Sequence, residues 1–541
     1  MMRLFWMFFV SGWLMAGAAH AQVQPAPQRP ATPPMLRPVG GPPSNLVQVM
    51  TATGDSLWFG PLIYLAPNGT TNFLAAEAPA LTSGENVVFG LDVDATPART
   101  VLWAGLAFDA GGGSAAAGGF LFSTDGGETF TQRPPALDSP TDTTVQYGAN
   151  TLPAVPTVQE ESATPQSIAY VPSTTAVWVA GAASGLRRSV DNGQTWERIV
   201  LPPDTASFIT PTEAYNFPLV APTQSRQGFL NHFAYSVVVD ETGTAWVGTA
   251  NGFNYSEPVA GSSDRAWRHV PFDGTPNAPT GDAVVRIAEQ PAPGRNPLWM
   301  ASWALNRSTQ RPERFGVTVV RGGGRTIEQT LLGQRIFDFA FRSTAAGDTV
   351  VYAGGDDGLF VSTDSGRSWE AVQQFDVPAA DVRLPPGVGV RSLATTTGAL
   401  WVGTTEGLLR TTNEGALIDG DLGTHPTWQL FRVNVPLQPE TPSEAVPAVR
   451  TYAYPNPFTP SADGQTRIRY ATEQAGSVTV RIYDFGMNEV RVLRDEAPQA
   501  GEHEVAWNGR GAGGLRLPNG PYFYEVQTPS ATARGKILLI D

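Results

Sequence analysis

Short stretches of apolar and small residues recur along most of the chain, and each forms a predicted strand that leads through a turn into a second strand. Each stretch contains Trp or Tyr. The seven copies are 57–60, 102–105, 177–181, 245–249, 298–302, 351–355 and 400–404. They span residues 45–433 at about 55 residues each, close to the size of one propeller blade. The pattern therefore predicts an all-β protein whose main body is a seven-bladed β-propeller.

Each repeat divides into four strands, A to D. In the third repeat these are predicted at 167–171, 177–180, 185–189 and 196–200. Further inner strands are predicted at 233–239, 284–288, 336–341 and 390–394. The first repeat starts with its own A strand near Leu46, and the last ends with its own D strand at 428–433. We therefore expect the ring to close by packing between blades, without a swapped strand.

A second motif, with the spacing S-x-D-x-G-x-x-W/F, follows several of these strands. Its three copies contain Ser123, Asp125, Gly127 and Phe130; Ser189, Asp191, Gly193 and Trp196; and Ser362, Asp364, Gly366 and Trp369. A short Asp or Ser side chain accepts hydrogen bonds from its own turn, and Gly permits a positive φ. The aromatic residue then packs on the sheet. We interpret the motif as structural, and assign its aspartates neither catalysis nor calcium binding.

This spacing resembles the Asp-box, or BNR repeat, of sialidase-like and sortilin-like propellers. Residues 411–415 look like a degenerate copy, with Trp428 displaced by an insertion. The segment 399–408 is similar to the propeller repeats of bacterial sensor ectodomains. These resemblances imply the fold and leave the function open.

Long loops are predicted to gather on the face where the D–A and B–C connections open. The insertions are 133–166, 201–229 and 373–389 in the first class, and 106–118 and 303–315 in the second. They carry aromatic and charged side chains, which suit a glycan or protein ligand. The predicted ligand-binding residues are Tyr147, Tyr215, Phe217, Trp303, Arg307 and Arg311. The alternative is that these loops are decoration without a ligand.

No residue is assigned a catalytic role. A glycoside hydrolase usually places two carboxyl groups across the scissile bond. The resemblance to sialidases implies a Tyr nucleophile and three Arg from different blades, yet Arg307, Arg311 and Arg314 lie on one loop. The xyloglucanase type uses two propellers, and this chain has room for one. We therefore favour a non-enzymatic binding protein. A sialidase-like or xyloglucanase-like glycoside hydrolase and a structural or adhesive surface protein are the alternatives.

Residues 434–450 are predicted to be a linker, and 451–541 a small β-sandwich. Six strands are predicted at 466–470, 477–483, 489–493, 503–507, 521–527 and 536–540. Turn sequences such as Asn508-Gly509 and Asn519-Gly520 separate some of them. About seven short strands in this length favour an Ig-like fold.

Four stretches of this segment, 454–458, 480–484, 501–509 and 519–524, resemble the FlgD-type Ig-like domain. The same pattern, ending in the basic and apolar tail 534–541, is similar to type IX secretion (Por) C-terminal sorting domains. The resemblance implies that the secretion machinery recognises this domain, and the residues that carry it are Gly520, Tyr522, Gly535 and Lys536. The alternative is an accessory sandwich without a sorting role.

The N-terminus predicts export. Arg3 precedes an apolar run, and Ala19-His20-Ala21 has the form of a signal peptidase site, so residues 1–21 are expected to be a signal peptide. Residues 22–44 are rich in Pro and Gln and are predicted to be a disordered lead-in. The expected location is the cell surface or the medium, and no later segment predicts an integral membrane protein.

Composition excludes several classes of function. A formal net charge of −14 argues against nucleic acid as a partner. The chain has no Cys and only five scattered His, so neither disulfides nor a metal site nor another cofactor is predicted.

Overall fold

The computed structural model describes residues 36–540 with short internal gaps. The gaps are 40–41, 43–45, 61–62, 68–69, 77, 83–85, 97–98, 111–113, 222–227, 293–295, 306–314, 325, 345–346, 378–381, 385–386, 419–425, 432–436, 439–440, 446–450, 461–463, 473 and 498–500. The predicted signal peptide lies outside the described residues. The chain divides into a larger unit, which contains the sheets up to Phe431, and a C-terminal unit, which contains residues 451–540.

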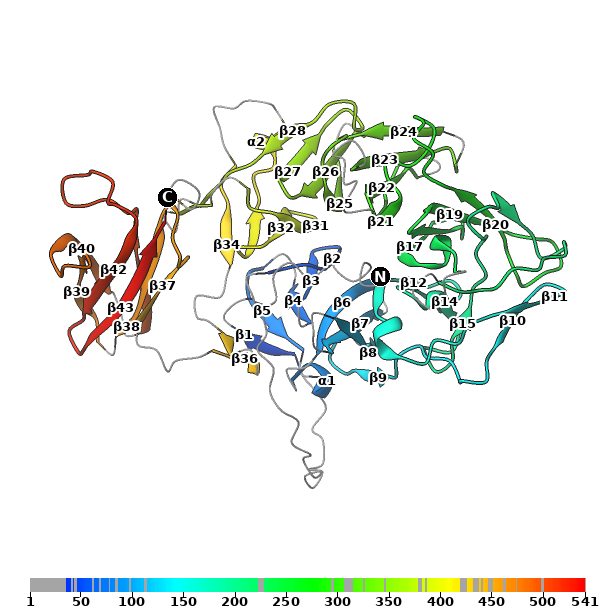
Figure 1. Cartoon of the computed structure of the whole chain (residues 1–541), viewed down its shortest axis with the longest axis horizontal. Coiled ribbons are helices and arrows are strands. Elements are labelled where there is room, and N and C mark those ends of the chain that lie inside the picture. The colour runs from blue at the N-terminus through cyan, green and yellow to red at the C-terminus, as the bar shows by residue number, and fades with distance from the viewer. Residues whose placement is uncertain are drawn as a thin grey trace, which may run out of the picture. The chain divides into compact units, whose positions relative to one another are not determined.

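The larger unit contains seven antiparallel sheets of four or five strands, arranged around a common centre as in a β-propeller (Figure 1). The first three sheets contain β1 (Arg37–Val39), β2 (Met50–Thr53), β3 (Ser56–Phe59), β4 (Tyr64–Ala66) and β5 (Phe73–Ala75); β6 (Asn86–Thr96), β7 (Arg99–Asp109), β8 (Ala115–Ser123) and β9 (Thr131–Arg133); and β12 (Pro165–Val171), β13 (Ala176–Gly181), β14 (Gly185–Ser189) and β15 (Glu197–Arg198). The fourth contains β16 (Phe208–Ile209), β17 (Ala234–Val239), β18 (Ala245–Thr249), β19 (Gly252–Glu257) and β20 (Ala266–Val270). The last three contain β21 (Ala283–Glu289), β22 (Leu298–Trp303), β23 (Gly316–Arg321) and β24 (Thr326–Thr330); β25 (Ile336–Ser343), β26 (Thr349–Gly355), β27 (Gly358–Ser362) and β28 (Glu370–Val372); and β31 (Val390–Thr396), β32 (Ala399–Thr404), β33 (Leu408–Thr411) and β34 (Gln429–Phe431).

Short elements lie between these strands or follow the last of them. They are α1 (Pro79–Thr82), β10 (Thr144–Tyr147), β11 (Asn150–Pro153), η2 (Glu160–Ser162), η3 (Leu230–His232), β29 (Phe375–Val377), β30 (Val382–Leu384), α2 (Gly415–Ile418), β35 (Leu437–Gln438) and β36 (Thr441–Ala445). In the described part of the chain, no helix is long and apolar enough to cross a membrane.

The repeated apolar stretches are the second strands of the sheets. Every residue of β13, β18, β22 and β32 is buried. A strand covered on both faces needs apolar or small residues at consecutive positions, because neither face meets water. This explains why these stretches lack the alternating pattern of a half-exposed strand.

Each first strand carries a β-bulge in the sheets that begin with β6, β12, β17, β21, β25 and β31. The bulge adds one residue, so two neighbouring side chains are aimed in new directions. The residue after the bulge contacts the next sheet. The contacts are Ser167 Oγ with Val237 N at 3.3 Å, Ser236 Oγ with Ile287 N at 2.9 Å, Arg286 Nε with Asp338 Oδ1 at 2.7 Å, Asp338 Oδ2 with Leu393 N at 2.8 Å and Ser392 Oγ with Val47 O at 2.8 Å. In the second sheet this position is Gly90, and a Cβ there would contact Ile168 at 3.3 Å.

The three S-x-D-x-G-x-x-W/F turns share one set of hydrogen bonds. In the second turn, Ser189 Oγ donates to Asp191 Oδ1 at 2.7 Å, and it accepts from Gly193 N at 2.9 Å. Asp191 in turn accepts from the backbone and hydroxyl of Thr195 at 2.9 and 2.6 Å. The same bonds occur around Asp125 and Asp364. Hydrogen bonds from Thr195 lower the pKa of Asp191 to about 2, so this carboxylate stays ionised within its own turn.

These turns also pack against the preceding sheet. A Cβ on Gly366 would lie 2.6 Å from Cη2 of Trp299, a residue of β22. Trp369 Nε1 donates to Thr330 Oγ1 of β24 at 2.8 Å. In the other two turns, Gly127 packs against Trp58, and Gly193 packs against Trp103. The glycine is therefore required both by its positive φ and by the ring beside it.

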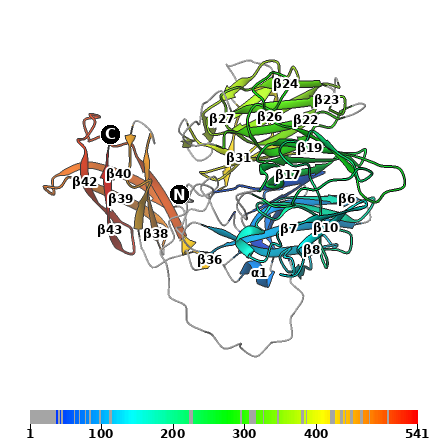
Figure 2. The same cartoon turned by 45° about the vertical axis from the view of Figure 1, so that its right-hand side comes forward.

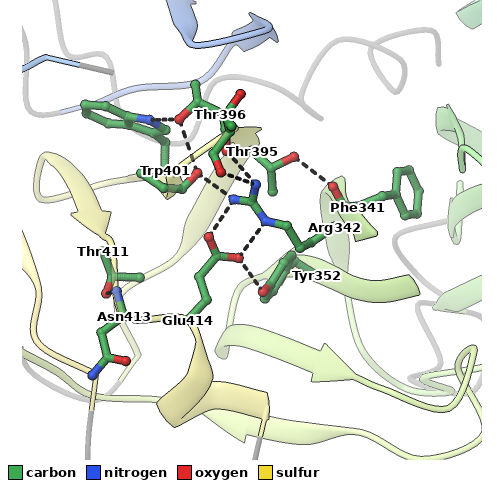
Figure 3. Close-up of polar contacts among 11 residues, drawn as sticks. Phe341, Arg342, Tyr352, Thr395, Thr396, Trp401, Thr411, Asn413 and Glu414 are labelled. Carbon is green, nitrogen blue, oxygen red and sulfur yellow. Dashed lines mark hydrogen bonds and ion pairs between the residues drawn. The ribbon is translucent and has the colours of Figure 1, made fainter. Parts of the chain in front are cut away.

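Two regions differ from expectation. The predicted lead-in includes Arg37–Val39, yet these residues form β1 and pair with β5, where Phe73–Ala75 offers an open sheet edge. The degenerate turn at 411–415 keeps one bond, from Asn413 N to Thr411 Oγ1, and sends Glu414 toward the preceding sheet (Figure 3). There Glu414 accepts from Arg342 and Tyr352.

The C-terminal unit is a two-sheet sandwich, as predicted for an Ig-like fold (Figure 2). One sheet contains β37 (Thr451–Tyr454), β38 (Thr466–Thr472) and β41 (Gly501–Trp507), and the other contains β40 (Glu489–Ala497), β39 (Gly476–Tyr483), β42 (Gly520–Gln527) and β43 (Thr532–Leu539). Alternate residues of the strands point inward, so Ile482, Tyr524 and Trp507 are buried together. Four of the six predicted strands begin within one residue of the observed ones, and β43 begins four residues earlier than predicted.

Candidate functional site

A cavity of about 490 Å³ lies among the first strands of all seven sheets. The β-bulges create much of its lining. Each bulge contains one residue that has no partner on the neighbouring strand, and this residue faces the cavity. Val49 occupies the corresponding place in the first sheet. The seven lining residues are Val49, Phe89, Gln166, Tyr235, Val285, Phe337 and Arg391. Cavities of this size accept small ligands rather than folded protein surfaces.

Cationic and aromatic side chains gather on one side of this cavity. The guanidinium carbon of Arg335 lies 4.3 Å from the Trp303 ring centroid, and that of Arg391 lies 3.9 Å from the Phe337 ring centroid. The two rings meet edge to face at 5.1 Å. Asp356 completes this set, which we call the arginine–aromatic cluster. Its members come from the fifth, sixth and seventh sheets and their connections.

The backbone fixes the rings of this cluster. Trp303 is 2 % exposed, and its Nε1 donates to Ile336 O at 2.8 Å. Asp356 N donates to Arg335 O at 3.2 Å, which places the carboxylate beside the guanidinium groups. Because the guanidinium groups stack on the rings, the cluster presents cations to the cavity rather than bare aromatic faces. Such a surface favours an anion over a neutral sugar ring.

The carboxylates that line the cavity are both paired. Asp356 contacts Arg391 at 3.0 Å and Arg335 at 3.8 Å. Asp338 Oδ1 forms an ion pair with Arg286 Nε at 2.7 Å. Burial raises the pKa of Asp338, although the charge of Arg286 opposes that shift. Both belong to the sixth sheet. A pair of carboxylates from separate blades, which a glycoside hydrolase of this type would use, is not among the described lining residues.

The predicted ligand-binding residues that the structure describes lie in two different places. Trp303 lines the cavity. Tyr147 is 2 % exposed, and its hydroxyl donates to Arg265 O at 2.8 Å. The Tyr215 ring lies between those of Tyr147 and Phe217, with centroid distances of 6.3 and 5.9 Å in a tilted and an edge-to-face arrangement. Tyr147 belongs to a core cluster of the third and fourth sheets, and Tyr215 and Phe217 are partly buried against it. Their role in ligand binding stays a prediction.

The remaining two predicted residues, Arg307 and Arg311, lie outside the described residues. The structure brings a second set of arginines together, which the sequence did not reveal. Arg286, Arg335 and Arg391 reach the cavity from three neighbouring sheets or their connections. Arg286 and Arg391 were missed because a bulge shifts the side-chain direction by one position, which simple strand alternation does not reveal. Arg335 precedes β25 and lies outside the predicted strands. Alignment of the predicted inner strands on one another would have placed Phe337 and Arg391 at equivalent positions.

Within the described residues, no group of three or more His, Asp or Glu side chains could hold a metal ion. In the C-terminal unit, the residues predicted for sorting have distinct environments. Tyr522 packs against Trp507, and its hydroxyl donates to Pro518 O at 2.7 Å. Gly535 leaves room for the Tyr524 hydroxyl, which would lie 2.2 Å from an added Cβ. Gly520 begins β42 with a φ of 153°, and Lys536 is exposed on β43.

One family match falls within this sandwich. Residues 457–532 match the FlgD Ig-like domain. The match covers β38 to β42 in full and confirms the fold predicted for the C-terminus. No curated protein matches the chain.

Among solved structures, the chain is similar to PorZ of Porphyromonas gingivalis, a surface component of the type-IX secretion system, at 17 % identity over 92 % of this chain and 75 % of that one, with a TM-score of 0.33. It is similar to a GH74 xyloglucanase of Xanthomonas campestris at 15 % identity over 93 % and 81 % of the two chains, with a TM-score of 0.48. It is also similar to FlgD of P. aeruginosa at 20 % identity over 17 % and 76 %, with a TM-score of 0.14.

Proposed function

We propose that this chain is an exported surface protein whose seven sheets form a closed β-propeller with Asp-box turns. Its cavity binds an extracellular ligand through an anionic group, and its C-terminal domain directs type IX-like secretion. Two hydrogen bonds between the first and last sheets support ring closure. Ser392 Oγ donates to Val47 O at 2.8 Å, and Val47 N donates to Thr404 O at 3.2 Å. Closure of this kind uses packing between blades and no swapped strand.

The observation that carries the ligand proposal is the arginine–aromatic cluster. Arg335 and Arg391 are cations partly shielded from water by rings and cavity walls, and a guanidinium in such a place pairs strongly with an anion. The chain as a whole carries −14, so a cationic cavity runs against its general charge. Of the two ligand classes that we predict, a glycan fits better than a protein, because the cavity volume suits one or a few sugar units. We therefore favour an acidic glycan.

A glycan array with neutral and acidic members tests this proposal on the exported chain, without residues 1–21. We expect binding of acidic glycans that is lost in Arg391→Gln and kept in the matched control Arg268→Gln. Arg268 lies on the outer strand β20, where its side chain is 45 % exposed. Binding of a protein partner alone would contradict the glycan class. If neither a glycan nor a protein binds, the ligand proposal fails and a structural or adhesive role is favoured.

The enzymatic alternative has one observation in its favour. Arg286, Arg335 and Arg391 approach one cavity from different sheets, which resembles the arginine arrangement implied for sialidases. Tyr235 also lines the cavity, yet burial raises the pKa of its hydroxyl, the opposite of what a nucleophile needs. Glycosidase assays on the same glycans decide between the two. Turnover that disappears in Asp356→Asn would make the protein a hydrolase.

The sorting proposal is tested by fusing residues 451–541 to a periplasmic reporter in a bacterium with type IX secretion. We expect the reporter to reach the cell surface. Lys536→Gln removes the predicted recognition charge and should reduce export, whereas Arg534→Gln on the same strand should not. Both side chains are exposed, so neither change should unfold the domain. Equal export of the two variants would contradict the role of Lys536.

A further inference from the structure

We infer that Asp356 is a built-in competitor, which holds the anion position of the arginine–aromatic cluster until a ligand carboxylate displaces it. This inference rests on the proposed binding of an acidic glycan. It goes further by naming the ligand group as a carboxylate and by assigning a specificity-determining role to a residue of the chain itself.

The geometry around Asp356 supports this inference. One oxygen, Oδ1, lies 3.0 Å from Arg391 Nη1, and the other, Oδ2, lies 3.8 Å from Arg335 Nη1. Two guanidinium groups from different sheets therefore share a single carboxylate. A planar group with two oxygens matches this spacing, as expected for carboxylate recognition by arginine. The side chain of Asp356 thus shows which chemical group the two cations can receive.

Asp356 differs from the other carboxylate that lines the cavity. Asp338 is 5 % exposed and holds both Arg286 and the backbone N–H of Leu393, so it is fixed between sheets. Asp356 is 41 % exposed. An ion pair with that exposure contributes little free energy. Displacement of Asp356 therefore costs little, whereas displacement of Asp338 would break a contact between blades.

The charge of the cluster also supports the inference. While Asp356 occupies the cluster, one of its two positive charges is neutralised, and a second anion meets a weaker field. If a ligand displaces the Asp356 carboxylate toward water, the positive charges of Arg335 and Arg391 both become available to that ligand. Removal of the Asp356 charge should therefore strengthen binding. A residue that only orients Arg391 would have the opposite effect, and this difference makes the inference testable.

Isothermal titration calorimetry with tri-galacturonate measures the effect, with the methyl-esterified trisaccharide as the neutral ligand. Asp356→Asn keeps the side-chain shape and should bind tri-galacturonate about fivefold more tightly than the unmodified chain. Asp357→Asn is the matched control, because it changes the same charge at the neighbouring exposed residue outside the cavity lining. Its affinity should stay within about twofold. Arg391→Gln should abolish binding.

The outcomes separate the inference from the proposed function. If Arg391→Gln loses binding and Asp356→Asn binds no more tightly than Asp357→Asn, Asp356 is no competitor and the proposed function stands. If Asp356→Asn weakens binding, the residue positions Arg391 instead. Preference for a hexaglutamate peptide or a sulfated disaccharide over tri-galacturonate would overturn the ligand class. If no variant binds any acidic ligand, the proposed function fails and the inference with it.

Discussion

Tyr352 Oη donates to Glu414 Oε2 at 2.7 Å across the boundary between the sixth and seventh sheets (Figure 3). At three other boundaries between sheets, the second strand carries a Trp in place of Tyr352. The ring of that Trp packs on the glycine of the turn in the following sheet. Here the ring is a Tyr and the turn is degenerate, so a polar contact replaces ring packing. Arg342 completes it, because its guanidinium donates to Glu414 and to the carbonyl groups of Thr396 and Ala399.

We expect Glu414→Gln to lower the free energy of unfolding by about 3 kcal/mol, because it leaves the Arg342 charge unpaired in a partly buried site. The side chains of Glu414 and Arg342 are 12 % and 20 % exposed. Chemical denaturation measures the change. Glu197→Gln breaks an ion pair that is half exposed on the Glu side and should cost less than about 1 kcal/mol. Equal costs for the two variants would show that the boundary does not depend on this contact.

Gly366→Ala should destabilise the chain by about 3 kcal/mol. The new Cβ would meet Trp299 at 2.6 Å, and the backbone φ of 88° adds strain. Gly347→Ala separates the two effects, because Gly347 has a φ of 90° and nothing within 4 Å of its Cβ position. It should cost only about 1 kcal/mol. If both variants lose equal stability in thermal denaturation, the contact between turn and ring contributes nothing.

Stability should fall as the pH drops from 7 to 5. Burial lowers the pKa of His232 from its ordinary 6.5 to about 4 in the folded chain. The unfolded chain therefore binds the proton first, and protonation below 6.5 favours unfolding. The loss amounts to about 2 kcal/mol at pH 5. Burial also lowers the pKa of His269, which adds to the effect.

Denaturation curves at pH 7 and pH 5 measure this dependence. In His232→Gln the difference between the two pH values should shrink, even though the variant is weaker at both. His503→Gln, in the C-terminal unit, serves as the comparison. An unchanged pH dependence in His232→Gln would assign the acid sensitivity to other groups.

Arg286→Met should cost about 3 kcal/mol at pH 7, because Asp338 then remains charged and buried without its cation. Burial already raises the pKa of Asp338, and loss of Arg286 raises it further. The deficit should therefore shrink as the pH falls and Asp338 takes up a proton. The double variant with Asp338→Asn should recover much of the loss at pH 7. No recovery would mean that Arg286 acts through packing alone.

Much of the fold could be predicted because the same apolar stretch recurs in seven copies, and together they identify a pattern that one copy alone would not. The apolar second strands follow directly from burial on both faces, as β22 and β32 illustrate. The inner strand predicted at 336–341 lies within β25. The FlgD-type sandwich was predictable because alternation and turn residues agree over its whole length.

The site was harder to predict, for two physical reasons. Tyr147, Tyr215 and Phe217 stand in long insertions, and aromatic residues in such loops can equally pack against the core beside them, as they do here. Phe337 and Arg391 face the cavity because a bulge precedes the contact with the next sheet. A bulge leaves no signature in hydrophobic alternation, since it changes direction without changing composition.

The bulges have one more consequence. In each of six sheets they assign adjacent residues to separate tasks: one residue joins its neighbour sheet, and the residue before it faces the cavity. Substitutions such as Gln166 to a larger residue would alter what the cavity accepts and leave Ser167 in contact with Val237. The contacts between sheets and the lining of the cavity can therefore change along the same strands without constraining each other.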